Sequence, residues 1–504
     1  MEFWFLLFAS LCIYISLSSL LGFLRTKRLP PGPPTIPFLG NLLWLLQSSS
    51  DFSTIEPTLR RLRARYGPIV TLYIGSFPAI FVTTHEAAHR VLVQGGATFA
   101  NRPQALETSK ILFSNQHTLS SAAYGPLWRL LRRNFTSIFH PSRVKLYSHG
   151  RKWALDMLKT NLQTEAASGK AVLIWDHIQH AMFSLVVFMC FGEKLKENVV
   201  REIEKVQRTM IVNFIRFNVL NFMPKLGKIV FRKLWKEFLE MHQNQENVLL
   251  PLIRERVRKR KEASKDKDFL VISYIDSLFD LQLPQEGRKF SESEIVSLCS
   301  EFLNAGTDTT TTTLQWAMAN IVKHQGIQQK LYSEINRVVK KGEEIKEDDL
   351  DKMHYLKATV LETLRRHPPG HFILPRAATG DDAVFDGYHI PRNAIVNFTV
   401  ADMGWDPNVW EEPMEFKPER FLKGDGGEVA FDVKGVKEIK MMPFGAGRRV
   451  CPAIHVALLH VQYFVANLVR EFKWTAEDVD LSEKQDFSIV MKNPLRAHVT
   501  PRMD

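Results

Sequence analysis

The chain begins with an apolar segment long enough to cross a membrane. Residues 3–24 are 22 consecutive positions without a charged side chain, and a basic cluster of Arg25, Lys27 and Arg28 follows at once. As a helix this segment would reach about 33 Å, and the hydrocarbon core of a bilayer is about 30 Å thick. A cleaved signal peptide would carry its positive charge before the apolar run. The sequence therefore predicts an uncleaved transmembrane anchor over residues 1–24, with the rest of the chain in the cytosol.

Proline separates this anchor from the remainder of the chain. Four prolines occupy the five positions from residue 30 to residue 34. Such a segment cannot form a helix and favours a stiff, extended conformation. We therefore expect a basic, proline-rich hinge over residues 25–34 and one globular domain over residues 35–504.

Helical hydrophobic patterns dominate the globular part, and the longest cover residues 128–139, 202–218, 233–260 and 291–323. Strand signals are confined to residues 69–75, 79–83 and 383–397, and the last contains the hairpin-type dipeptide Asp386-Gly387. The expected fold class is mostly α with a small β region.

The charge balance and the cysteines narrow the kind of partner. The 66 Lys and Arg residues exceed the 54 Asp and Glu residues, which suits an anionic membrane surface, a nucleic acid or an acidic protein. Because there is no zinc-finger spacing and no aromatic RNA-binding signature, we expect no nucleic-acid partner. The four cysteines lie far apart and predict neither a disulfide framework nor a metal pair. Three lie in apolar runs, but Cys451 lies among glycines and arginines.

Cys451 belongs to the most distinctive segment of the chain, PFGAGRRVCP over residues 443–452. The two glycines allow a close backbone approach or a positive φ. Pro452 suits the first position of a helix expected over residues 453–472, so the dipole and the arginines would favour the Cys451 thiolate. A thiolate in such a loop is suited to be an axial ligand of haem iron that promotes O–O cleavage. The alternative is a buried structural cysteine beside a turn.

A second unusual segment lies in the helix expected over residues 291–323, which opens with a capping-box pattern. One Gly and six Thr fall within the eight positions 306–313, at a cost of about 3–4 kcal/mol relative to Ala. Their hydroxyls can bond back to the carbonyl four residues earlier and bend the helix. A helix distorted in this way could present Asp308 and Thr309 as a proton route. The alternative is a buried threonine-rich helix with no chemistry.

Several arginines have spacings that suggest specific partners. Glu362 and Arg365 are three apart on one helix face, and Arg420 offers a second guanidinium downstream. In isolation such a pair is more often a surface ion pair of little worth. Trp128 and Arg132 are four apart on a predicted helix.

Together these segments resemble the cytochrome P-450 superfamily of haem-thiolate monooxygenases. The loop meets the family pattern Phe-x-x-Gly-x-Arg-x-Cys with Phe444, Gly447, Arg449 and Cys451. Residues 305–310 are similar to its oxygen-activation motif. One departure is Ala453, where the family usually has Gly. The resemblance is closest to plant microsomal enzymes of the 89A subfamily, notably in residues 297–304 and 490–494.

The resemblance implies a haem-thiolate monooxygenase fold with an N-terminal transmembrane helix, and haem b with Cys451 as the axial iron ligand. Asp308 and Thr309 would be catalytic, delivering protons. Glu362, Arg365 and Arg420 would lock the region around the haem loop. The residues expected to contact the haem are Trp128, Arg132, Arg376, Phe444 and Arg449.

The resemblance also implies that one atom of O2 enters a small, largely apolar organic substrate, with NADPH electrons delivered by a cytochrome reductase. The enzyme would be a single-pass protein of the endoplasmic reticulum membrane with a cytosolic catalytic domain. Basic residues suited to docking an acidic reductase are Lys434, Lys437, Lys440, Arg133 and Arg448.

Two other functions stay open on the sequence. A haem-thiolate isomerase or dehydratase would need no reductase, but such relatives tend to lack the Asp308–Thr309 pair. A non-catalytic haem-binding protein would have no need of the costly threonine-rich helix. By analogy, the substrate is lined by residues 101–124, 214–222, 305–309, 372–374 and 487–489, with Asn115, Gln116 and His117 as candidate polar contacts.

Overall fold

The structure is a computed structural model, and it describes residues 29–36, 40–41, 55–75, 77–221, 224–263, 273–381, 383–424, 429 and 431–502. The expected anchor over residues 3–24 lies outside these residues. The chain divides into two compact units that interleave along the sequence. Unit 1 comprises residues 1–104, 370–411 and 432–450, and unit 2 comprises residues 105–369, 412–431 and 451–504.

Unit 1 contains most of the β-structure predicted from the sequence. Its main sheet has the order β1-β2-β6, with β1 and β2 antiparallel and β6 parallel to β2. Alternating apolar residues of these strands pack on α4 and on the segment before the cysteine loop, which forms one core. Its elements are α3 (Ile55–Tyr66), β1 (Ile69–Ile74), β2 (Phe77–Val82), α4 (His85–His89), η2 (Arg90–Gln94), β4 (Ala383–Phe385), β5 (Tyr388–Ile390), β6 (Ile395–Phe398), α17 (Ala401–Gly404) and η7 (Gly447–Arg449).

Unit 2 is built mainly from helices. The first half of the unit carries α5 (Glu107–Leu112), α6 (Pro126–Ile138), α7 (Pro141–Val144), η3 (Lys145–Tyr147), α8 (Ser148–Ala166), β3 (Val172–Leu173), α9 (Ile174–Phe191), α10 (Glu197–Asn213), η4 (Arg216–Asn221), α11 (Pro224–Val230), α12 (Arg232–Ala263) and α13 (Tyr274–Leu278). The second half carries α14 (Glu292–Lys323), α15 (Gln325–Val338), η5 (Glu347–Lys352), α16 (His354–Arg366), η6 (Pro418–Phe421), α18 (Ile454–Glu471), β7 (Phe472–Thr475), β8 (Glu483–Gln485), β9 (Ile489–Met491) and β10 (Arg496–Pro501).

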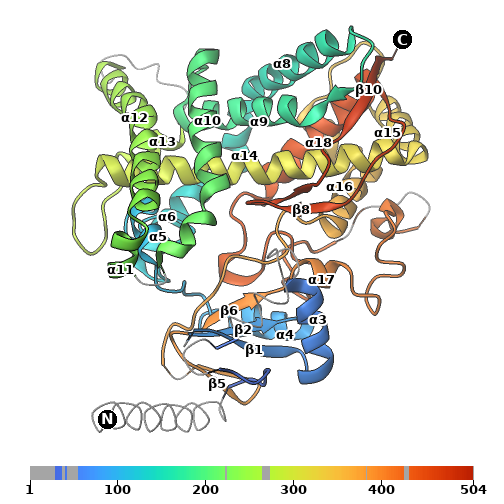
Figure 1. Cartoon of the computed structure of the whole chain (residues 1–504). Helices are drawn as coiled ribbons and strands as arrows, with labels where there is room; N and C mark the ends of the chain where they lie inside the picture. The colour runs from blue at the N-terminus through green and yellow to red at the C-terminus, as the bar shows by residue number, and fades with distance from the viewer. Residues whose placement is uncertain are drawn as a thin grey trace, which may run out of the picture. The chain divides into compact units, whose positions relative to one another are not determined.

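The long helix α14 forms the centre of unit 2. It packs against α9, α10, α12 and α18, and Figure 1 shows it in yellow, running through that unit. The predicted capping box is present, because Ser291 accepts from the Glu294 amide and the Glu294 carboxylate accepts from the Ser291 amide. Most residues of α14 are buried, so this helix is placed by packing on several sides.

The mostly α fold with a small β region is confirmed. Among the described residues, only α9 is long and apolar enough to cross a membrane, and most of it is buried inside unit 2 as a core helix. The predicted hairpin is also present, because β4 and β5 pair through Asp386 and Gly387, which both have positive φ. One expected helix is shifted: the pattern over residues 202–218 corresponds to α10, which begins at Glu197 and ends at Asn213.

Candidate active site

The glycines of the cysteine loop have the backbone conformation that the sequence predicts. Gly445 and Gly447 both have a φ of +68°. A Cβ atom on Gly447 would lie only 1.8 Å from the Leu92 carbonyl oxygen, whereas one on Gly445 would meet only Ile373, at 3.6 Å. The loop therefore runs directly against η2 at Gly447, and a side chain has no room there.

Cys451 lies three residues before the helix that follows it. α18 begins at Ile454 with Ala453 as its N-cap, so Pro452 is outside the helix and is not its first residue as expected. The Ala453 amide points back and donates to Cys451 Sγ over 3.4 Å. Ala453 has φ −107° and ψ 22°, a conformation open to any residue, so the departure from the family's Gly causes no backbone strain.

The protonation of Cys451 differs in part from the expectation. Burial raises the pKa of the thiol above its ordinary value, although the Ala453 amide and the Arg132 guanidinium act in the opposite direction. A nearby guanidinium therefore favours the thiolate, but it belongs to Arg132 of α6 and not to an arginine of the loop, and burial outweighs it. A cation bound directly at the sulfur would be needed to hold it as a thiolate.

Unit 1 holds an accumulation of buried positive charge. Arg376 is 2% exposed, and its Nη1 is buried with no hydrogen-bond partner in the described part of the chain. Burial lowers the pKa of Arg376 well below its ordinary value, and the charges of Arg102 and Arg449 lower it further. Arg449 is also buried and donates from Nε to the Ala100 carbonyl over 2.8 Å. A buried guanidinium with an unpaired donor atom is costly, so Arg376 is suited to bind an anionic ligand.

Unit 2 brings the other two predicted haem contacts together on α6. Trp128 is buried, and its ring packs on Tyr124 with the centroids 5.1 Å apart. Burial lowers the pKa of Arg132, and the Cys451 sulfur opposes this shift. Phe444 of unit 1 is half-buried.

These residues fit the haem that the sequence predicts. The orphaned Nη1 atom of Arg376 offers a donor to an acidic group such as a propionate, and the Cys451 thiol offers a soft ligand for iron. The family residues are therefore of the right chemical types within each unit.

The threonines of α14 behave partly as expected. The hydroxyls of Thr309 and Thr310 donate to the carbonyls of Ala305 and Gly306 over 2.8 and 2.9 Å, and Thr313 donates to Thr309 in the same way. This is the predicted back-bonding, but α14 stays a continuous helix through the segment. The expected distortion does not interrupt it.

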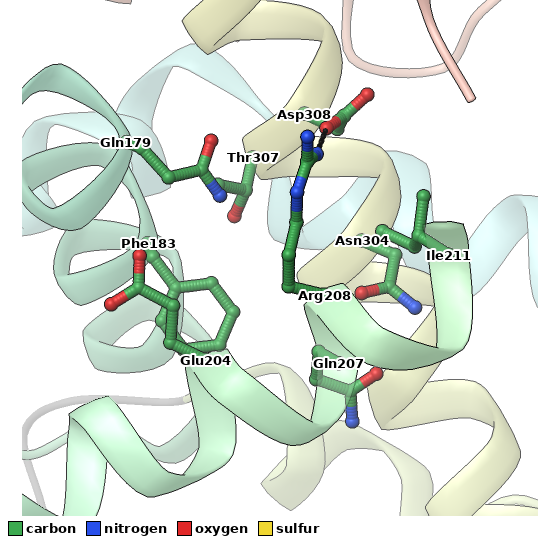
Figure 2. Close-up of a pocket in the computed structure, with 9 residues that line it drawn as sticks. All are labelled: Gln179, Phe183, Glu204, Gln207, Arg208, Ile211, Asn304, Thr307 and Asp308. Carbon is green, nitrogen blue, oxygen red and sulfur yellow. Dashed lines mark hydrogen bonds and ion pairs between the residues drawn. The ribbon is translucent and has the colours of Figure 1, made fainter. Parts of the chain in front are cut away.

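Asp308 is held by residues that no local sequence pattern connects with it. Its carboxylate is almost fully buried and accepts from Arg208 Nη1 of α10 over 2.7 Å. It also accepts from the Ser488 hydroxyl, which lies between β8 and β9 and is paired with Thr312. Burial raises the pKa of Asp308 above its ordinary value, and Ser488 and Arg208 counteract this. Figure 2 shows the Arg208 side chain reaching up to Asp308 from α10.

Glu362, Arg365 and Arg420 form the predicted cluster. The Glu362 and Arg365 side chains are both fully buried and joined by two hydrogen bonds of 2.7 and 2.8 Å. Arg420 reaches the same carboxylate from η6 over 3.1 Å. Arg365 also donates to the Pro413 carbonyl, so the cluster ties α16 to residues 412–420.

A loop before α6 is fastened to α14 in a way that the sequence did not reveal. Ser114, Asn115 and Gln116 all have positive φ, although none is glycine. Downstream, Glu301 accepts from the amides of Leu119 and Ser120 over 2.9 and 2.6 Å. Two expected substrate contacts are used internally: His117 pairs with Glu294 over 2.6 Å, and the Gln116 side chain bonds to the backbone at Ala105 and Ser121.

Comparisons with known proteins agree with this arrangement. The family model described as Cytochrome P450 matches residues 30–500. "Cytochrome P450 89A9" of Arabidopsis thaliana is 49% identical, over 99% of this chain and 98% of the relative. "Geraniol 8-hydroxylase" of Catharanthus roseus is 30% identical, over 94% of each chain. A solved structure of a zebra fish cytochrome P450 with progesterone has a TM-score of 0.73 at 22% identity, over 88% of this chain and 99% of that one.

Proposed function

The chain belongs to the cytochrome P450 family, and from this we propose that it is a membrane-anchored monooxygenase acting on a small, largely apolar organic molecule. Its membership of the P450 monooxygenases agrees with the resemblance seen in the sequence. The observation that carries the proposal is Cys451, a thiol in a glycine loop before α18, in the same unit as the acid–alcohol pair of α14.

Haem b is the cofactor that this site would hold. Cys451 would ligate the iron, Arg132, Arg376 and Arg449 would bind the acidic side chains of the haem, and Trp128 and Phe444 would pack on it. When bound, the haem supplies activation of O2 for insertion of one oxygen atom, while the other leaves as water.

Asp308 and Thr309 are proposed to move protons toward the place where O2 is reduced. They are consecutive on α14, and Thr309 is half-buried while Asp308 is buried. The Asp308 carboxylate can pair with Arg208 when it is ionised and can carry a proton when it is neutral. With the Thr309 hydroxyl next to it in the chain, it is suited to relay protons. An isomerase or a haem carrier would not require this pair.

The substrate class is proposed from the relatives and from the apolar residues expected to line the site. Relatives of similar length are described as geraniol 8-hydroxylase and germacrene A acid 8-beta-hydroxylase. These names describe hydroxylation of small organic molecules, a class consistent with apolar residues such as Phe214 and Ile489.

Electrons are proposed to come from NADPH through a cytochrome reductase bound to the exposed basic residues. Lys434, Lys437, Lys440 and Arg448 of unit 1 are exposed, as is Arg133 of unit 2. The proposed organisation is an anchor over residues 1–24, a hinge over residues 25–34 and a catalytic domain over residues 35–504 at the endoplasmic reticulum membrane.

The haem ligand is tested by Cys451→Ala in the full chain. We expect the variant to lose the absorption of the reduced carbon monoxide complex that is characteristic of thiolate ligation, because alanine cannot bind iron. The matched control is Cys190→Ala, which removes a fully buried thiol elsewhere in unit 2. If the signature survives in Cys451→Ala, another residue ligates the iron and the proposal is wrong.

The reaction class is tested by Thr309→Ala, with the reductase, NADPH and a substrate selected from a metabolite screen by its induced spin shift. We expect NADPH consumption to continue with more peroxide and less product, because loss of general acid–base assistance commonly costs about 10²–10⁴-fold. The ratio of product to NADPH is the measurement, since a misfolded variant would stop consuming NADPH altogether. An isomerase would turn over without NADPH, and a carrier would give no product. Unchanged coupling in both Thr309→Ala and Asp308→Asn would remove the proton route.

A further inference from the structure

The hairpin formed by β8 and β9 is fastened to the centre of unit 2 at its turn and at both of its strands. The strands pair antiparallel, and residues 486–488 join them. The Ser488 hydroxyl in this turn bonds to the Asp308 carboxylate, so the turn lies beside the acid of the proposed proton pair. Phe487 in the same turn is 48% exposed, and we expect it to line the substrate site. The position of the hairpin therefore bears on which molecules the site can accept.

One face of α14 supplies three of the contacts to the hairpin. Asp308, Thr312 and Trp316 follow one another at intervals of four residues, so they lie on the same side of the helix. Asp308 and Thr312 both bond to the Ser488 hydroxyl, and the bond from Thr312 measures 3.1 Å. The Trp316 indole donates to the Ile489 carbonyl over 2.9 Å. The hairpin is thus held along about two turns of α14.

The Trp316 ring is itself fixed by His367, which comes directly after α16. The two rings stack face to face, with their centroids 4.0 Å apart and an interplanar angle of 1°. Both residues are fully buried. Because side chains in a protein interior are closely packed, neither ring has room to tilt. The indole N–H is therefore directed at one fixed point, the Ile489 carbonyl.

His367 and the residues after it also hold the strands of the hairpin. The His367 Nδ1 atom bonds to the Glu483 carboxylate at the start of β8 over 3.0 Å, and Figure 1 shows this strand beside α16. Burial lowers the pKa of His367 to about 4, so the ring is neutral at neutral pH. Since a carboxylate only accepts hydrogen bonds, the single proton of the ring lies on Nδ1. On the other strand, the Ile489 amide donates to the Pro369 carbonyl over 2.8 Å.

We propose that Trp316 and His367 are positioning residues that set how far the β8–β9 hairpin reaches toward Asp308, and that they thereby limit the size of the substrate at Phe487. Both rings are buried, so they act through the hairpin and not by touching the substrate. The ligands that this arrangement sorts are apolar molecules that differ in bulk on the side of Phe487. A pair that only filled the core would not need directed hydrogen bonds to both strands of one hairpin. The inference rests on the proposed haem site and deepens the proposed function.

The test compares Trp316→Phe with Trp474→Phe in the full-length, haem-loaded enzyme. Trp316→Phe keeps a ring to stack on His367 but removes the N–H that bonds to Ile489. Trp474 is the matched control, because it is also fully buried and its indole donates over 2.9 Å to a backbone carbonyl, that of Leu468 and not one of the hairpin.

The probes are imidazole and N-phenylimidazole, which both bind haem iron through a ring nitrogen and shift its absorption spectrum. We expect Trp316→Phe to bind N-phenylimidazole about 10-fold more weakly, the effect that loss of about one methylene contact has in an apolar pocket. Imidazole should bind as in the wild type, because it lacks the phenyl group that the hairpin would contact. Trp474→Phe should match the wild type for both probes.

A change nearer the surface guards against misfolding of the core variant. The Glu483 side chain is 20% exposed, so Glu483→Ala breaks the contact with His367 without opening a cavity in the core. It should weaken N-phenylimidazole binding in the same direction as Trp316→Phe does. Glu483→Gln keeps an acceptor for His367 but loses the charge that lies 3.8 Å from Arg366. It should therefore restore most of the affinity.

Hydrogen–deuterium exchange of residues 483–491 gives a readout that does not depend on activity. We expect faster exchange in Trp316→Phe and Glu483→Ala and no change in Trp474→Phe. An unchanged ratio of the two dissociation constants in both Trp316→Phe and Glu483→Ala would overturn the inference, as would equal effects of Trp316→Phe and Trp474→Phe. If Trp316→Phe takes up no haem, Glu483→Ala alone decides. If imidazole causes no spectral shift in the wild type, the proposed haem site is wrong and the inference is wrong with it.

Discussion

At the scale of single residues, Gly447 is the position where the cysteine loop tolerates least change. Its left-handed φ disfavours any residue with a Cβ by about 1–2 kcal/mol, and a methyl group would also overlap the Leu92 carbonyl. Gly445, two residues earlier, has the same φ, but a Cβ there would make only an ordinary contact with Ile373. Substitutions at the two glycines can therefore distinguish the effect of backbone strain from that of a steric clash.

We expect Gly447→Ala to lower the thermal unfolding midpoint and the haem content clearly more than Gly445→Ala does. The reason is that alanine at a positive φ is unfavourable in both variants, while only Gly447→Ala also forces the loop away from η2. Calorimetry and the haem-to-protein absorbance ratio measure the two effects. Equal losses in the two variants would show that strain alone makes the glycines necessary.

The functional residues that could be predicted from the sequence are those that belong to a short local motif. Cys451 and its glycines lie within seven positions, and the capping box of α14 lies within four. Arg208 and Ser488 could not be predicted as partners of Asp308, because they lie 100 and 180 positions away and only tertiary packing brings them together. The same holds for Glu301, whose contact with the amides of residues 119 and 120 leaves no local pattern.

At the scale of elements, helix and strand positions followed from hydrophobic periodicity, while their pairing did not. The pattern over residues 291–323 corresponds closely to α14, and the strand signals over residues 69–75 and 79–83 correspond to β1 and β2. The parallel pairing of β6 with β2 has no signal in either strand. The helix expected from residue 453 begins at Ile454. Pro452, which was expected at the first helical position, lies in the turn that precedes α18.

The cluster around Glu362 joins two elements strongly enough to test. Removing this carboxylate leaves Arg365 buried without its ion partner, and breaking such a pair costs about 3–5 kcal/mol. We therefore expect Glu362→Ala to unfold at a midpoint several degrees below the wild type and to lose haem on purification. The measurement is thermal unfolding followed by circular dichroism at one fixed scan rate, since a protein of this size can unfold irreversibly.

The matched control is Glu292→Ala, which breaks the exposed pair of Glu292 with Arg254. Exposed pairs contribute about 0–1 kcal/mol, so this variant should stay close to the wild type. If Glu362→Ala is no less stable than Glu292→Ala, the cluster does not hold α16 to residues 412–420.

At the scale of the whole molecule, two glycosylation sequons report on which side of the membrane the domain lies. They are Asn134-Phe135-Thr136 and Asn397-Phe398-Thr399. We expect no change of mass on endoglycosidase treatment of the native protein, because the domain is proposed to face the cytosol. The structure adds a reason of its own: the Asn134 amide donates to Ser277 over 2.9 Å, and Asn397 lies within β6.

A sequon added before Met1 provides the positive control, since this end is proposed to face the lumen and should become modified. A glycosidase-sensitive native protein with an unmodified tag would mean that the orientation is reversed. If neither the added sequon nor the native sequons are glycosylated, the chain is not inserted in the secretory membrane. That result would contradict the proposed anchor.

The pairing of β2 with β6 has a consequence for folding during synthesis on the ribosome. Ala79 meets Ile395, a residue made 316 positions later, and at about 5–20 residues per second this is a wait of roughly 15–60 s. Throughout that time one side of β2, an apolar strand of sequence FPAIFV, has no β6 to cover it. An open apolar edge of this kind readily pairs with another chain. The nascent polypeptide thus depends on chaperones until most of it has been translated, and a ribosome stalled before residue 395 would release a fragment prone to self-association.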